Sequence, residues 1–123
     1  MNGGQINLTA IFIIGENMTE LIYYPICPTE DLPPGERLFI ELDDEPVVIF
    51  NLAGDYYAIA DVCTHDMGPL GEGEVEGHQV ICPRHGARFD IKTGEVLTLP
   101  AVTGVASYPV RVKDGIVEIG VEE

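Results

Sequence analysis

After residue 20 the chain consists of short runs rich in apolar residues, separated by turn-forming residues, a pattern typical of β-strands. Arg37–Leu42 is one such run. The pattern predicts strands at Leu21–Cys27, Arg37–Leu42, Val47–Leu52, Tyr56–Val62, His78–Ile81, Arg88–Ile91, Glu95–Leu99, Ser107–Val112 and Ile116–Val121. A single helical turn is expected at Thr29–Leu32. The sequence therefore predicts an all-β fold.

Turn-forming residues between these strands predict antiparallel hairpins. Asp43–Pro46 is expected to turn the chain into Val47–Leu52, and Gly54-Asp55 separates that strand from Tyr56–Val62. The last two strands are joined by Lys113-Asp-Gly115, and Asp-Gly is a strong signal for a tight hairpin turn. We expect both pairs to form hairpins.

The chain of 123 residues is one domain in length, long enough to bury about two-thirds of its unfolded surface around one core. Residues 1–17 differ from the rest. Their apolar run, Leu8–Ile14, has no basic residue before it and is far too short to span a bilayer, so it resembles neither a signal peptide nor a membrane anchor. We predict a disordered N-terminal extension at 1–17 and the folded domain at 18–123.

The net charge of −15 excludes nucleic acid and anionic membranes as partners, because both would repel such a surface. The charge suits docking onto a basic protein surface, although it is equally compatible with simple solubility. There are three cysteines, and only Cys27 lies outside the motif described next. Since one thiol cannot form an internal bridge, we expect a reducing compartment and a cytoplasmic location.

Two short segments carry the candidate chemistry. They are Cys63-Thr-His65 and Cys82-Pro-Arg-His85, separated by sixteen residues. Thiolate and imidazole favour zinc or iron–sulfur over magnesium or calcium. Structural zinc pairs are normally two to four residues apart. The alternative is a cluster of two irons to which each loop gives one Cys and one His. The third histidine, His78, is expected to be a solvated turn residue.

These two segments resemble those of a Rieske-type ferredoxin, in which two histidines replace two cysteines on one iron of a [2Fe–2S] cluster. The resemblance runs from roughly Leu21 to Val121 and is strongest over Cys63–Asp90. It implies one Rieske cluster per chain. By resemblance, the thiolates of Cys63 and Cys82 hold one iron, and the ring nitrogens of His65 and His85 hold the other. Zinc in the same four ligands remains the alternative.

The resemblance also implies a Rieske fold, with stacked antiparallel β-sheets and an inserted cluster-binding subdomain at about Asp61–Lys92. Gly68 and Pro69 are expected to make a tight turn under the cluster. In this family a third loop shields the cluster from water, and Leu99–Val102 corresponds to it. Exclusion of water would stabilise the cluster and lower the reorganisation needed when an electron arrives.

Several family residues are absent here. High-potential relatives carry a disulfide at the positions of Gly68 and Arg84, and hydroxyl donors at those of Ala87 and Phe89. Neither Ala nor Phe can donate a side-chain hydrogen bond. Two missing donors would lower the reduction potential by about 100–200 mV.

Nearby charge is expected to act in the same direction. The acidic residues between and within the two segments are Asp66, Glu72, Glu74 and Glu76, opposed by Arg84 and Arg88. An acidic surplus disfavours the addition of an electron. We therefore predict a potential near the lower end of the family range, at roughly −150 mV.

The sequence contains no dinucleotide-binding motif and no further set of metal ligands, so we expect an electron carrier with no catalytic residues. The resemblance implies that the carrier accepts electrons from an NAD(P)H-dependent flavin reductase and passes them to a terminal oxygenase, such as a ring-hydroxylating dioxygenase. Oxygenase subunits with a related domain typically have Arg and Trp where Asp66 and Ala87 stand. This difference favours the ferredoxin, which we expect to be a monomer.

Two alternatives remain open. The small Rieske subunit of an assimilatory nitrite reductase shares the domain and would bind the large subunit of that enzyme. A zinc-stabilised β interaction module is the alternative of a different class. It predicts a colourless protein without a reversible redox step.

Overall fold

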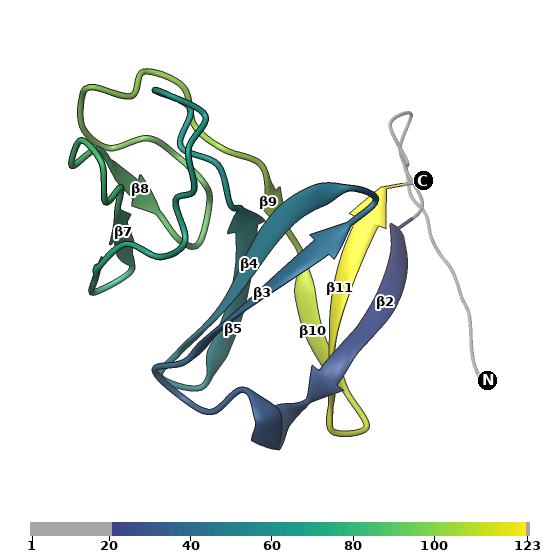
Figure 1. The fold of residues 1–123 in the computed structure, drawn as a ribbon. Helices are drawn as coiled ribbons and strands as arrows, with labels where there is room; N and C mark the ends of the chain where they lie inside the picture. Colours follow the sequence, from purple (N-terminus) through teal and green to yellow (C-terminus); the bar gives the residue numbers. More distant parts are fainter. Residues whose placement is uncertain (1–20, 123) are drawn as a thin grey trace, which may run out of the picture.

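The computed structural model describes residues 21–122 as an assembly of antiparallel β-sheets (Figure 1). The elements are β2 (Leu21–Pro28), the 3₁₀ helix η1 (Thr29–Asp31), β3 (Arg37–Leu42), β4 (Glu45–Leu52), β5 (Asp55–Ala60), β6 (Val75–Glu76), β7 (Gln79–Ile81), β8 (Arg88–Asp90), β9 (Ser107–Tyr108), β10 (Val110–Lys113) and β11 (Ile116–Glu122). The all-β prediction is confirmed. The predicted extension at 1–17 lies outside the described residues.

Three sheets are formed, with strand orders β3-β4-β5-β9, β10-β11-β2 and β6-β7-β8. Every pair of neighbouring strands is antiparallel. The first two sheets make the body of the molecule. The small third sheet projects from one end, opposite the end that carries η1 (Figure 1). Among residues 21–122 no helix is long and apolar enough to cross a membrane.

Strand β4 separates two cores, and it is therefore buried on both faces rather than on one. Val47 and Ile49 pack in the core between the two large sheets, together with Ile119 of β11. Val48 and Phe50 point to the opposite face and pack in the core of the third sheet and its loops. The body thus supports the third sheet through side chains of one central strand.

The predicted hairpin turns are present, but two strands begin earlier than predicted, and β5 begins at Asp55, one residue early. Asp114 and Gly115 have φ values of 53° and 78°, as a tight Asp-Gly turn requires. Asp43 and Asp44 form a similar two-residue turn, with φ values of 52° and 67°. Because this turn is so short, β4 begins at Glu45, two residues earlier than predicted.

The predicted strand Glu95–Leu99 is wrong. Only Val96 forms an isolated bridge, to Phe89 in β8. The pairing stops because the backbone N–H of Arg88 donates to the side-chain Oγ1 of Thr98 (2.9 Å), so a side chain takes the donor that a longer strand would use. The chain from here to Val105 forms loops that pack on the third sheet.

The predicted strand Ser107–Val112 is divided into β9 and β10 at Pro109. Proline has no N–H to donate, so it interrupts a ladder. Before it, β9 pairs with β5, and after it, β10 pairs with β11. Pro109 is therefore the point at which the chain passes from one large sheet to the other.

Candidate metal centre

Cys63 begins a loop that is closed by two backbone hydrogen bonds. Its N–H donates to the carbonyl of Gly68 (2.7 Å), and its own carbonyl accepts from the N–H of Met67 (2.6 Å). Met67 has a φ of 63°, so the left-handed residue of this turn is Met67 rather than the glycine that follows it. The tight turn predicted from Gly68 and Pro69 is present, but the strained position is one residue earlier.

Cys82 begins a second loop with the same construction. Its N–H donates to the carbonyl of Ala87 (2.7 Å), and its carbonyl accepts from the N–H of Gly86 (3.0 Å). Gly86 has a φ of 81°. The two loops are thus alike in backbone, although one carries its histidine two residues after the cysteine and the other three. We call them the first and second ligand loops.

The four candidate ligands form two pairs. Cys63 and Cys82 are both buried in the core of the third sheet. Burial, and next the neighbouring Cys82 thiol, raise the pKa of the Cys63 thiol. His65 and His85 are exposed, and their ring centroids lie 4.9 Å apart with the rings nearly perpendicular.

This pairing fits a cluster of two metal ions better than a single ion. Two soft thiols lie inside the fold and two imidazoles lie outside, so each loop contributes one donor to each side. Two thiolates on one iron and two imidazoles on the other are the donor set of a Rieske cluster.

The backbone around the ligand loops is fixed by contacts that the sequence did not reveal. Arg37 of β3 donates from Nη1 to the carbonyls of Gly71 and Gly73, the latter at 2.7 Å. The Asp61 carboxylate accepts from the N–H groups of Leu70 (2.9 Å) and Gly71 (2.6 Å). Such contacts join residues far apart in the chain, and only the position of Asp61 just before Cys63 gave a weak signal.

The segment Leu99–Val102 lies beside the first ligand loop, as the family resemblance implied. Thr64 donates from its hydroxyl to the carbonyl of Thr103, and Ala101 is buried in the same core as the two cysteines. Leu99 and Val102 remain exposed. The segment thus packs through Ala101 in the core that holds both cysteines, while two of its apolar side chains face solvent.

Charged side chains near the ligand loops are largely paired. Oδ2 of Asp66 lies 2.7 Å from Nε of Arg84 and 3.4 Å from Nε2 of His85. The backbone N–H of Gly68, and then the charges of Arg84 and His85, hold the pKa of Asp66 below its ordinary value. Arg88 pairs with Glu76 at 2.9 Å. Among the described residues, Glu72 and Glu74 have no basic partner, so an acidic surplus remains.

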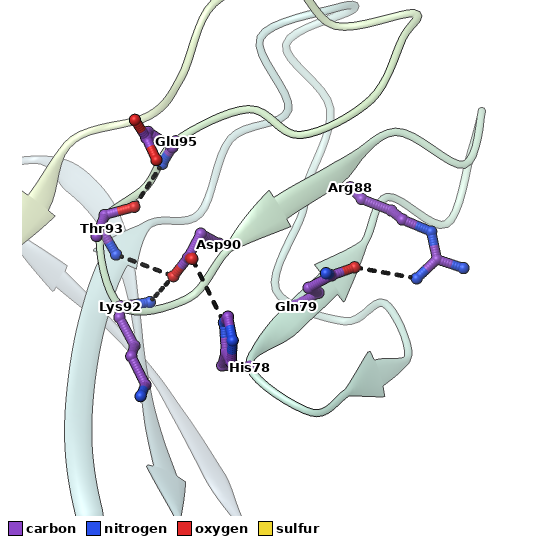
Figure 2. Close-up of polar contacts among 7 residues, drawn as sticks. All are labelled: His78, Gln79, Arg88, Asp90, Lys92, Thr93 and Glu95. Atoms are coloured by element: carbon purple, nitrogen blue, oxygen red, sulfur yellow. Dashed lines mark hydrogen bonds and ion pairs between the residues drawn. The ribbon is translucent and has the colours of Figure 1, made fainter.

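His78 lies in the turn between β6 and β7 and is exposed, as predicted for a solvated turn residue. Its Nδ1 is 3.3 Å from Oδ2 of Asp90, and its side chain is 51% exposed. Oδ1 of Asp90 also accepts from the backbone N–H groups of Lys92 (2.7 Å) and Thr93 (3.3 Å). Figure 2 shows these contacts around the turn that follows β8.

Comparison with known proteins identifies a family and matches the fold. The family model of the Rieske [2Fe-2S] domain matches residues 22–109. The 3-phenylpropionate/cinnamic acid dioxygenase ferredoxin subunit of Shigella flexneri serotype 5b is 41% identical over 99 residues, which cover 79% of this chain and 92% of that protein.

Solved structures give the same result. The ferredoxin of carbazole 1,9a-dioxygenase from Nocardioides aromaticivorans IC177 has a TM-score of 0.74 at 27% identity, covering 79% of this chain and 95% of its own. A chain in the complex of reduced oxygenase and oxidised ferredoxin in carbazole 1,9a-dioxygenase has a TM-score of 0.74 at 29% identity, covering 80% of this chain and 92% of its own. The predicted fold class is confirmed by these neighbours.

Proposed function

The chain belongs to the Rieske [2Fe-2S] domain family, and from this premise we propose that it is the ferredoxin component of a multicomponent oxygenase system. The family's [2Fe–2S] cluster, when bound, takes up and releases one electron. The chain's own residues hold that cluster, limit its contact with water and present one edge of it to partners. The protein is thus an electron-transfer component, not the enzyme that oxidises the substrate.

Four ligands are part of the proposal. Cys63 and Cys82 hold one iron through sulfur, and His65 and His85 hold the other through a ring nitrogen. The separation of these donors into a buried pair and an exposed pair supports this assignment. The folded domain is assigned to 18–123, of which the structure describes 21–122.

The single observation that carries the proposal is the exposure of both histidines beside the buried cysteines. A carrier needs one edge of its redox centre at the surface, because electrons must pass to a docked partner over a short distance. The side chain of His85 is 45% exposed. Three exposed apolar side chains lie in the first ligand loop and in the Leu99–Val102 segment, which precedes the Thr103 contact with that loop: Met67, Leu99 and Val102, exposed by 73%, 75% and 77%. We call these three residues the apolar rim.

The proposed electron acceptor is a terminal oxygenase of the ring-hydroxylating class. Support comes from the name of the dioxygenase ferredoxin subunit and from the solved complex of an oxygenase with its ferredoxin. The proposed donor is an NAD(P)H-dependent flavin reductase, with both partners using basic surfaces that complement the charge of −15. The similar proteins favour this system over a nitrite reductase. A monomer in the cytoplasm suits such a mobile carrier.

An anaerobic dithionite titration of the purified protein tests the proposal. Iron and acid-labile sulfide are assayed on the same sample, followed by visible absorption and electron paramagnetic resonance. We expect about two irons and two sulfides per chain and a reversible one-electron step, whose reduced form gives a rhombic signal of mixed nitrogen and sulfur ligation. A colourless protein with one zinc would overturn the carrier and support the interaction module.

A further inference from the structure

One buried carboxylate oxygen lies between the two ligand loops. Oδ2 of Asp66 is shielded from solvent and has no aligned hydrogen bond among the described residues. Two groups of the second ligand loop face it, Nε of Arg84 at 2.7 Å and Nε2 of His85 at 3.4 Å. The carboxylate thus extends from one ligand loop to a candidate ligand of the other.

The other oxygen fixes the carboxylate in place. Oδ1 of Asp66 accepts from the backbone N–H of Gly68 at 3.0 Å, within the same loop. Gly68 also leaves room for the guanidinium, since a Cβ at this position would lie 3.0 Å from Cδ of Arg84 and 3.2 Å from Oδ1 of Asp66. The arginine therefore crosses the first ligand loop above a residue that has no side chain.

We propose that Asp66 is a positioning residue that orients His85 and lowers the reduction potential of the centre, and that Arg84 partly offsets this charge. The inference rests on the proposed function. A carboxylate opposite Nε2 leaves Nδ1 as the ring nitrogen free to bind iron, and it holds the ring against rotation. A fixed negative charge beside a ligand disfavours the addition of an electron, and the adjacent guanidinium opposes that effect.

The opposite charges of Asp66 and Arg84 predict opposite shifts of the reduction potential when each charge is removed. Asp66→Asn keeps the shape of the side chain and removes its charge, so the reduction potential should rise. Arg84→Gln removes the opposing charge and should lower the potential. For Asp66→Asn we expect the one-electron equilibrium to move by about tenfold, which corresponds to about 59 mV.

A matched control separates local from general electrostatics. Glu30→Gln makes the same change in net charge on exposed η1, at the end of the molecule opposite the third sheet (Figure 1). Its potential should stay close to that of the unaltered protein, because salt screens charges at such separations. Asp66→Glu restores the charge and should return the potential toward the original value.

The experiment is a spectroelectrochemical titration of the cluster-loaded variants at fixed pH and ionic strength. Opposite shifts for Asp66→Asn and Arg84→Gln, with little shift for Glu30→Gln, support the inference. Equal shifts of the potential for Asp66→Asn and Glu30→Gln overturn the inference. Shifts in the same direction for Asp66→Asn and Arg84→Gln also overturn it. If Asp66→Asn does not retain a cluster, Arg84→Gln decides by the direction of its shift. A colourless unaltered protein overturns the proposed function itself, whereas coloured variants with unshifted potentials overturn only this inference.

Discussion

Met67 and Gly86 occupy equivalent positions in the two ligand loops: each follows its cysteine by four residues, donates its backbone N–H to that cysteine's carbonyl and has a positive φ. The left-handed conformation costs an L-residue about 1–2 kcal/mol, whereas glycine adopts it readily. The first loop therefore contains strain that the second avoids. In both loops the cysteine is buried and the histidine is exposed.

Gly86→Ala should destabilise the second ligand loop. A Cβ at Gly86 meets nothing within 4 Å, so the cost comes from the backbone alone and should be about 1–2 kcal/mol in the free energy of unfolding. Gly77→Ala is the matched control, since Gly77 also has a positive φ and open space but lies in the turn between β6 and β7. Both variants should lose similar stability in chemical denaturation, but only Gly86→Ala should speed the loss of iron. Equal rates of iron loss for Gly86→Ala and Gly77→Ala would contradict the prediction that the second ligand loop holds the iron.

Replacement of the candidate ligands should remove the cluster. We expect His65→Asn and His85→Asn to abolish the visible spectrum of the oxidised protein and to lower its iron content, because the exposed pair then lacks one donor. His78→Asn serves as the control, since His78 contacts only Asp90 among the described charged groups. An unchanged spectrum in either ligand variant would refute the assignment of that residue.

Ala87→Ser should raise the reduction potential. Ala87 is buried in the same core as both cysteines, and its carbonyl accepts from the N–H of Cys82. A hydroxyl placed there can donate to a cluster sulfur, as the resemblance to high-potential relatives implies. One hydrogen bond to a charged acceptor should raise the potential by on the order of 60–130 mV. Potentiometry with Ala101→Ser as a second buried control checks this, and a fall in potential for Ala87→Ser would contradict it.

The sequence was sufficient where local pattern decides the structure. β3 was predicted with its correct bounds because its six residues, most of them apolar, lie between two clear turn signals. The Asp-Gly turn followed from the dipeptide itself. The candidate ligands, too, were recognisable because their types and intervals are local properties of the chain.

The features that the sequence did not predict depend on contacts between residues far apart in the chain. The predicted strand at Glu95–Leu99 does not form because the Thr98 hydroxyl accepts a hydrogen bond from the backbone N–H of Arg88 in β8. The apolar and polar pattern of the sequence gives no sign of this contact. Arg37 reaches loop carbonyls more than thirty residues away. Asp66 and Arg84 were identified only as opposing charges, since their approach above Gly68 exists only in three dimensions.

The apolar rim should control the encounter with the oxygenase. Leu99→Asp and Val102→Asp place a charge where a docked partner would remove water, so the apparent Kd for the oxygenase should rise at least about tenfold, a loss of about 1.4 kcal/mol. Because both side chains are exposed, the free energy of unfolding should change by no more than about 0.5 kcal/mol. Stopped-flow transfer from the reduced protein to an oxygenase measures the loss of affinity.

Val112→Asp is the matched control for this prediction, because Val112 is an exposed apolar residue on β10, in the body of the molecule. It adds the same negative charge to a chain that already carries −15, so any general repulsion or attraction changes equally. If docking occurs through the histidine edge, only the rim variants slow transfer at low concentration, and transfer at saturating oxygenase is preserved. Equal slowing by Val112→Asp would show that net charge, and not contact at the apolar rim, governs association with the oxygenase.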